Sequence, residues 1–166
     1  MQTFIPDVLQ THFDEARYLF TEFMVEIKSG QTNKAYLKKV SARLDAHLDG
    51  LVVNFDAAWA ICEDALPGDT SDSLRDSPPE FSASEFFIAA FLAFQCQDLE
   101  KVKPVVEAAE SHASVLSAVA YGLSWLPWQQ SGFWANKFIA SSRPAISAIG
   151  LFCHQTYKQS ATLTTS

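Results

Sequence analysis

The residues of this sequence best suited to chemistry are one histidine and two nearby carboxylates, His12, Asp14 and Glu15. An imidazole beside a carboxylate could serve as an acid–base pair or as part of a metal site. Adjacent residues on a helix, such as Asp14 and Glu15, point in different directions, so we interpret the group as a solvated helical face. The adjacent carboxylates Glu63 and Asp64 diverge for the same reason and do not form a glycosidase pair.

The usual motifs of catalysis and cofactor binding are missing from the sequence. It contains no G-x-x-x-x-G-K-[ST] or G-x-G-x-x-G for phosphates, no G-x-S-x-G nucleophile and no H-E-x-x-H. Cys153 and His154 form an isolated pair without the second pair that would complete four zinc ligands. The sequence therefore predicts no catalytic residue, no metal and no cofactor, and we expect a protein that is not an enzyme.

The cysteines and the apolar runs indicate where the protein resides. Cys62, Cys96 and Cys153 are odd in number and far apart, which favours reduced, buried thiols over disulfides. The first residues lack the basic start and apolar run of a signal peptide. The longest apolar stretch, residues 86–94, is much shorter than the roughly 20 residues that a membrane span needs. We expect a soluble cytoplasmic protein that does not bind a membrane.

Charge is distributed unevenly along the chain, whose formal net charge is −7. Residues 1–50 hold six basic and seven acidic side chains, residues 51–110 three and twelve, and residues 111–166 three and none. An acidic middle argues against direct nucleic-acid binding and would suit a basic protein partner, although it could also be a solvated surface that aids solubility. The candidate contact residues in this stretch are Asp56, Glu63, Asp64, Asp69, Asp72 and Asp76.

Tryptophans are concentrated in one short stretch, since three of the four lie between positions 125 and 134. Trp125 closes an apolar run and is predicted to be core. Trp128 and Trp134 could either pack between helices or anchor a protein partner, because exposed aromatic side chains often dominate binding energy. We therefore include Trp128 and Trp134 among the candidate contact residues.

Apolar side chains recur at helical spacing over residues 7–27, 33–49 and 51–66. Val8, Phe13 and Phe20 fall on the stripe of the first helix. Only Asp49 and Gly50 separate the second helix from the third, and Gly50 is interpreted as a C-cap. So short a connection predicts an antiparallel helical hairpin over residues 37–66.

The remaining sequence predicts a series of shorter helices. Residues 67–81 are rich in Pro, Gly, Ser and Asp and are expected to form an exposed acidic loop. Helices are then predicted to start at Ser82, after Asp98, and at Ser111, Pro127 and Pro144. Their spacing of about 15 residues resembles that of HEAT-like antiparallel pairs. We expect one all-α domain over residues 1–157, a short α-solenoid, with a flexible tail at 158–166.

Four stretches resemble a bacterial family of HEAT-repeat-like proteins associated with type VI secretion effector loci. They are RLDAHLDGLVVNFDAAWAICEDAL (43–66), FFIAAFLAF (86–94), YGLSWLPW (121–128) and SSRPAISAIG (141–150). Members of the family are commonly longer than this chain and contribute no catalytic residues to compare. The resemblance implies an immunity protein that occludes a co-encoded toxin, for instance a nuclease with a basic surface. Its alternative implication is an adaptor or chaperone that loads an effector for secretion.

Overall fold

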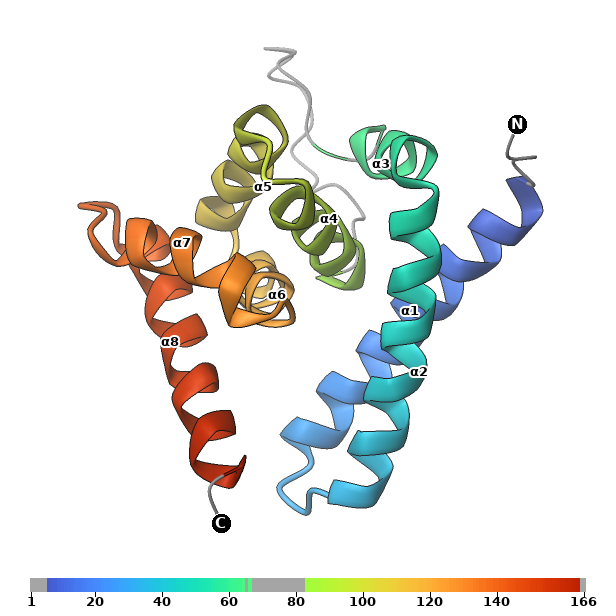
Figure 1. Cartoon of the computed structure of the whole chain (residues 1–166), viewed down its shortest axis with the longest axis horizontal. Helices are drawn as coiled ribbons and strands as arrows, with labels where there is room; N and C mark the ends of the chain where they lie inside the picture. The colour runs from blue at the N-terminus through green and yellow to red at the C-terminus, as the bar shows by residue number, and fades with distance from the viewer. Residues whose placement is uncertain (1–5, 65, 67–82, 165–166) are drawn as a thin grey trace. The chain divides into compact units, whose positions relative to one another are not determined.

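The computed structural model describes residues 6–64, 66 and 83–164, with side chains described through Gln159, and every element in these residues is a helix (Figure 1). This confirms the all-α class. The chain divides into two compact units, unit 1 (Met1–Asp64) and unit 2 (Ala65–Ser166), which we describe separately. The proposal of one domain over residues 1–157 stays a prediction.

Unit 1 is a helical hairpin followed by a short helix: α1 (Pro6–Lys28), α2 (Lys34–Val53) and α3 (Phe55–Glu63). Asn33 caps α2, because its side chain accepts a hydrogen bond from the backbone N–H of Tyr36 at 3.0 Å. The two long helices are antiparallel, since the polar pairs that join them lie at nearly equal sequence distances from the turn. These pairs are Glu26–Asn33, Glu22–Tyr36, Glu15–Arg43 and His12–His47.

The apolar stripes of α1 and α2 are buried at the spacing of three and four residues that a helix face requires. A leucine that is fully buried in this way stabilises the fold by about 1.5–3 kcal/mol. Val8, which we expected on the stripe, is 49% exposed, and its neighbour Leu9 is buried instead. The buried residues of the two helices are Leu9, Phe13, Ala16, Leu19, Phe20, Val40, Leu44, Leu48 and Leu51.

The turn predicted at Asp49 and Gly50 is wrong, because α2 runs through both residues to Val53. Gly50 does not cap a helix. A Cβ at this position would lie 2.8 Å from the ring of His12, so glycine leaves the space that the ring occupies. An internal glycine destabilises a helix by about 1 kcal/mol relative to alanine. The hairpin of unit 1 is therefore α1–α2 and not residues 37–66.

Unit 2 contains five helices among its described residues: α4 (Ala83–Cys96), α5 (Leu99–Ser111), α6 (Ala113–Ser124), α7 (Trp128–Ile139) and α8 (Pro144–Thr164). The predicted starts after Asp98, at Pro127 and at Pro144 agree with these bounds to within one residue. Residues 158–164, expected as a tail, continue α8. The predicted start at Ser82 and the loop at 67–81 lie outside the described residues.

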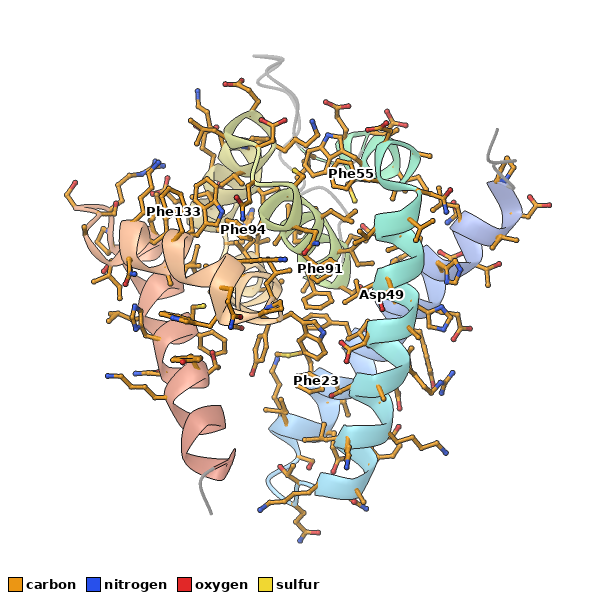
Figure 2. The ribbon with its side chains drawn as sticks, in the orientation of Figure 1. Phe23, Asp49, Phe55, Phe91, Phe94 and Phe133 are labelled. Atoms are coloured by element: carbon orange, nitrogen blue, oxygen red, sulfur yellow. The ribbon has the colours of Figure 1, made fainter. Side chains whose placement is uncertain are left out.

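Helix α4 is the centre of unit 2, because residues 86–94 are all buried, and it contacts α5, α6 and α7. A Cβ at Gly122 of α6 would lie 2.6 Å from the Cβ of Ala90, so glycine lets α6 approach α4 closely. Figure 2 labels Phe94 on α4. Toward α7, its ring lies 5.8 Å from both the Trp134 and Phe138 rings. Tight helix contact and aromatic packing thus hold this core together.

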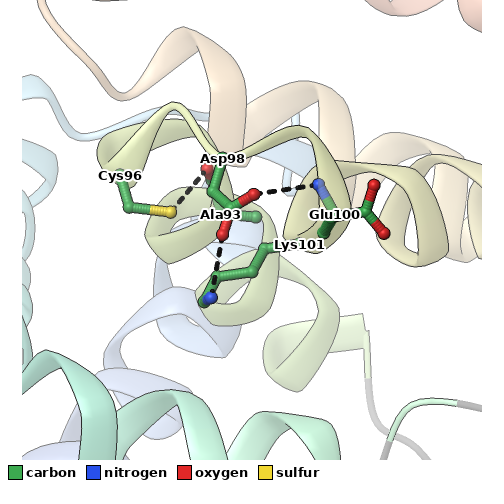
Figure 3. Close-up of polar contacts among 5 residues, drawn as sticks. All are labelled: Ala93, Cys96, Asp98, Glu100 and Lys101. Atoms are coloured by element: carbon green, nitrogen blue, oxygen red, sulfur yellow. Dashed lines mark hydrogen bonds and ion pairs between the residues drawn. The ribbon is translucent and has the colours of Figure 1, made fainter.

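A short corner joins α4 to α5 (Figure 3). Gln97 has a φ of 56°, a left-handed conformation that ends α4. Asp98 then caps α5, because its carboxylate accepts from the backbone N–H of Glu100 at 3.0 Å and from Lys101 Nζ at 3.0 Å. The hydrogen bond from Lys101, together with that from Glu100, holds the pKa of Asp98 below its ordinary 3.8. The capping role predicted for Asp98 is confirmed.

Candidate functional sites

Three of the six candidate acidic residues lie on or next to the short helix α3. Asp56 is in its first turn, Glu63 is its last residue and Asp64 caps its C-terminus, and all three side chains are exposed. Asp56 and Glu63 are two turns apart and so project from the same side of the helix. Asp69, Asp72 and Asp76 lie outside the described residues. The structure therefore brings half of the predicted acidic set together on α3.

The two candidate tryptophans have different environments in unit 2. Trp134 is only 3% exposed and packs against Phe94 and Phe138, so it is a core residue and cannot serve as a contact anchor. Its neighbour Phe133 is 65% exposed, and its ring meets that of Trp134 edge to face at 5.3 Å. Trp128 is half-buried and stacks on Tyr157 at 4.4 Å. Phe133 is thus the exposed aromatic residue at this position of α7 (Figure 2).

A pair of histidines joins the two helices of the hairpin in unit 1. The Nδ1 atoms of His12 on α1 and His47 on α2 lie 3.0 Å apart, and the rings meet edge to face with centroids 5.2 Å apart. One ring must therefore donate its Nδ1–H while the other accepts, which requires at least one neutral imidazole. The interpretation of His12 as part of a solvated face is wrong, because its ring is half-buried against Gly50.

The surroundings of the pair favour the neutral form of His47. Burial lowers the pKa of His47 below its ordinary 6.5, and the neighbouring His12 and Arg43 lower it further. Glu15 acts in the opposite direction, but its carboxylate is also 3.4 Å from the guanidinium of Arg43. Protonating both imidazoles would replace a hydrogen bond by repulsion. The pair is thus an acid-sensitive contact between α1 and α2.

Sequence reasoning missed this pair because it assigned the hairpin to the wrong helices. A turn at residues 29–33 pairs residue 12 with residue 47, whereas a turn at residues 49–50 leaves His12 without a partner. The signal that could have identified the pair was the run Ser29-Gly30 followed by the N-cap Asn33, which marks a turn between two long apolar stripes. The register of the hairpin then follows from that turn.

The cysteines do not form a reactive site in the described residues. Cys62 and Cys153 are buried, whereas Cys96 is exposed and donates its thiol hydrogen to the carbonyl of Ala93 at 3.3 Å. Burial raises the pKa of Cys153, so its thiol is protonated at neutral pH. His154 lies against Asn136 at 2.9 Å. Within residues 6–64 and 83–159, no three His, Cys, Asp or Glu side chains gather in a way that could hold a metal ion.

Comparisons of the chain with models of protein families, with curated proteins and with solved structures found no match. None of the helices in the described ranges is long and apolar enough to cross a membrane. The chain is thus a helical protein with an acidic α3 in unit 1 and an exposed aromatic side chain on α7 in unit 2.

Proposed function

We propose that this chain is a non-catalytic protein-binding protein, and that it neutralises a co-encoded toxin in the cytoplasm by occluding it. The observation that carries the binding role is Phe133. A phenylalanine that is 65% exposed loses the benefit of burial, and its edge-to-face contact with the buried Trp134 holds the ring at the surface. An exposed aromatic ring that is already ordered pays little entropy on binding, which is the property of a hot spot.

The acidic helix α3 supplies the second element of the proposal. Its exposed carboxylates Asp56, Glu63 and Asp64 would be attracted to a basic surface, such as the nucleic-acid-binding face of a nuclease. Complementary charge mainly accelerates encounter and selects the partner, whereas buried aromatic contacts slow dissociation. The acidic α3 would therefore speed association with the partner, and Phe133 would slow dissociation from it.

We further propose that unit 2 is a short HEAT-like stack. Helix α6 contacts both α4 and α8, and α4 contacts α5 while α7 contacts α8. The contacts of α6 with α4 and α8 would place these alternate helices in one layer, as successive repeats are placed in a solenoid. The toxin-blocking role follows from the resemblance to HEAT-repeat-like proteins near secretion loci.

Co-expression with the effector encoded next to this chain tests the proposal. We expect growth to be restored and the two proteins to co-elute as a stoichiometric complex. A stable complex without protection would replace immunity by the adaptor role, and the absence of any complex would reject both. Phe133→Ser should weaken the complex, whereas Tyr18→Ser should not, because Tyr18 is similarly exposed at 58% but is not among the proposed contact residues.

A further inference from the structure

Helix α7 presents a row of exposed side chains on one of its sides. Gln129, Phe133, Asn136 and Lys137 are all exposed, and their spacing of three and four residues places them on the same side of the helix. We call these four residues the α7 face. Gln129 and Asn136 are polar and uncharged, so Phe133 supplies the apolar surface of the α7 face and Lys137 its charge. One aromatic ring and one cation thus lie about one helical turn apart.

The buried indole of Trp134 orders both of these groups. The ring of Phe133 meets the Trp134 ring edge to face at 5.3 Å, and Lys137 Nζ lies 5.5 Å from the centroid of the same ring. Trp134 is itself 3% exposed and packed against Phe94. Side chains on a helix lean toward its N-terminus, so the ammonium group of Lys137 reaches back over Trp134 in the direction of Phe133. The two groups are therefore held in place before any partner arrives.

The charge of Lys137 remains available to a partner. Residues 111–166, which include α6, α7 and α8, contain three basic and no acidic side chains. The guanidinium of Arg143 is paired with the carboxylate of Glu110 on α5, whereas Lys137 contacts the Trp134 ring. A cation over an aromatic ring keeps its full charge, because the ring is neutral. The α7 face is therefore complementary to a carboxylate that lies beside an apolar group.

We propose, on the basis of the binding role already proposed for Phe133, that the α7 face binds an acidic segment of the protein partner. An apolar side chain of that segment packs on Phe133, and an Asp or Glu carboxylate about one turn away pairs with Lys137. The amide group of Asn136, whose Oδ1 lies 2.9 Å from His154 Nε2, adds an N–H donor at the edge of the same surface.

The α7 face and helix α3 differ in the charge that they select. A uniformly basic surface would be attracted to the carboxylates of α3 and repelled by Lys137. An apolar contact with Phe133 alone would accept many proteins, whereas an adjacent charge rejects those that present a cation there. The partner must therefore offer basic groups to α3 and an acidic, apolar segment to the α7 face.

Binding of the neighbouring effector to Lys137 variants at low salt tests the proposal. Lys137→Ala should weaken the complex by about 2- to 5-fold, the contribution of an exposed ion pair, and Lys137→Glu should weaken it more because it adds repulsion. Lys103→Glu is the matched control, since Lys103 is an exposed lysine on α5 and the change in net charge is the same. Tighter binding of Lys137→Glu, or equal effects of Lys137→Glu and Lys103→Glu, would overturn the proposal.

The folding of these variants is checked by the indole signal of Trp134 in ¹H–¹⁵N NMR spectra. Lys137 is exposed, so its replacement should leave the packing of Trp134 against Phe94 unchanged. If Lys137→Glu disturbs the indole signal, the comparison of Lys137→Ala with Lys103→Ala decides instead. A weaker complex for Lys137→Ala alone would support the proposal, and equal affinities would overturn it.

Two small probes test the charge preference of the α7 face without the effector. 4-Phenylbutyrate and 4-phenylbutylammonium share a ring and a short chain but carry opposite charges. Titrated into the intact chain at millimolar concentration, 4-phenylbutyrate should shift the backbone amide signals of Phe133 and Lys137 and bind about 2- to 5-fold more tightly than the ammonium compound. Absence of these shifts, or a preference for the cation, would overturn the proposal.

The two experiments separate failure of this proposal from failure of the proposed function. If no complex with the effector forms, the toxin-binding role is rejected, and the 4-phenylbutyrate comparison still decides whether the α7 face selects a carboxylate. If the complex forms and protects but is insensitive to Lys137, the toxin-binding role stands and the acidic segment is rejected.

Discussion

Different interactions hold the helices of the two units together. In unit 1, polar pairs at matched distances from one turn set the register of α1 against α2, and the core is largely aliphatic. In unit 2, α4 is buried on all sides and aromatic rings link it to α7. Residues 1–64 carry six basic and ten acidic side chains, whereas residues 83–164 carry five of each. The excess of acidic side chains thus belongs to unit 1, whereas charges in residues 83–164 are balanced.

The largest effect should come from the centre of unit 2. Phe94→Ala removes a ring that is fully buried against Trp134 and Phe138, and we expect a loss of about 3–5 kcal/mol in the free energy of unfolding. Urea unfolding followed by circular dichroism measures it. Phe133→Ala is the matched control: the same residue type is 65% exposed, so its change should stay within about 0.5 kcal/mol.

The same variant tests whether the units are independent. If they are, Phe94→Ala should open a urea range in which the Trp134 indole signal is lost while the imidazole signals of His12 and His47 remain native. Simultaneous loss of all three signals would contradict the division and support the single domain predicted over residues 1–157.

Acid should act first on unit 1. The pKa of His47 is lowered in the folded state, so the unfolded chain binds the proton more readily below pH 6.5. The associated stability is fully present above that pH and is lost as the pH falls through the folded pKa. His47→Gln should remove part of this dependence, an effect below about 1 kcal/mol because the pair is half-exposed. Urea midpoints between pH 5 and pH 8 measure it, and an unchanged slope would contradict the role of the pair.

Unit 2 has its own acid response, at lower pH, at the start of α5. The pKa of Asp98 is held below 3.8, so its stabilisation is complete above that value and disappears only as the pH falls through the lower folded pKa. Asp98→Asn and Asp98→Ala should both remove this part of the acid response, and Asp98→Asn should destabilise the fold less because it retains a capping oxygen. Carboxyl titration by NMR checks the pKa directly, and a value at or above 3.8 would refute the assignment.

How much the sequence predicted also differs between the units. The cap at Asp98 and the helix starts at Pro127 and Pro144 were predicted because their causes lie within a few residues. Gly50 was misinterpreted because a glycine that ends a helix and one that admits a ring are identical in local sequence. The only sign of the difference is His12, which lies 38 positions away in the sequence.

For the candidate contact residues, too, local sequence predicted only part of what the structure shows. The acidic residues of α3 were predicted to be exposed from composition alone, and they are. Trp134 and Phe133 are adjacent, and only the packing of α7 against α4 decides that the first is buried and the second exposed.

The central claim, that charge on α3 steers binding and Phe133 anchors it, is tested most directly by binding kinetics with the neighbouring effector at low and high salt. Asp56→Lys/Glu63→Lys should lower the association rate constant several-fold and weaken its salt dependence, with little change in dissociation. Asp7→Lys/Asp49→Lys, which changes the net charge equally on the same unit, should have a smaller effect. Phe133→Ala should raise the dissociation rate constant by about 5- to 30-fold. Equal effects of the two charge variants, together with unchanged dissociation of Phe133→Ala, would contradict the claim.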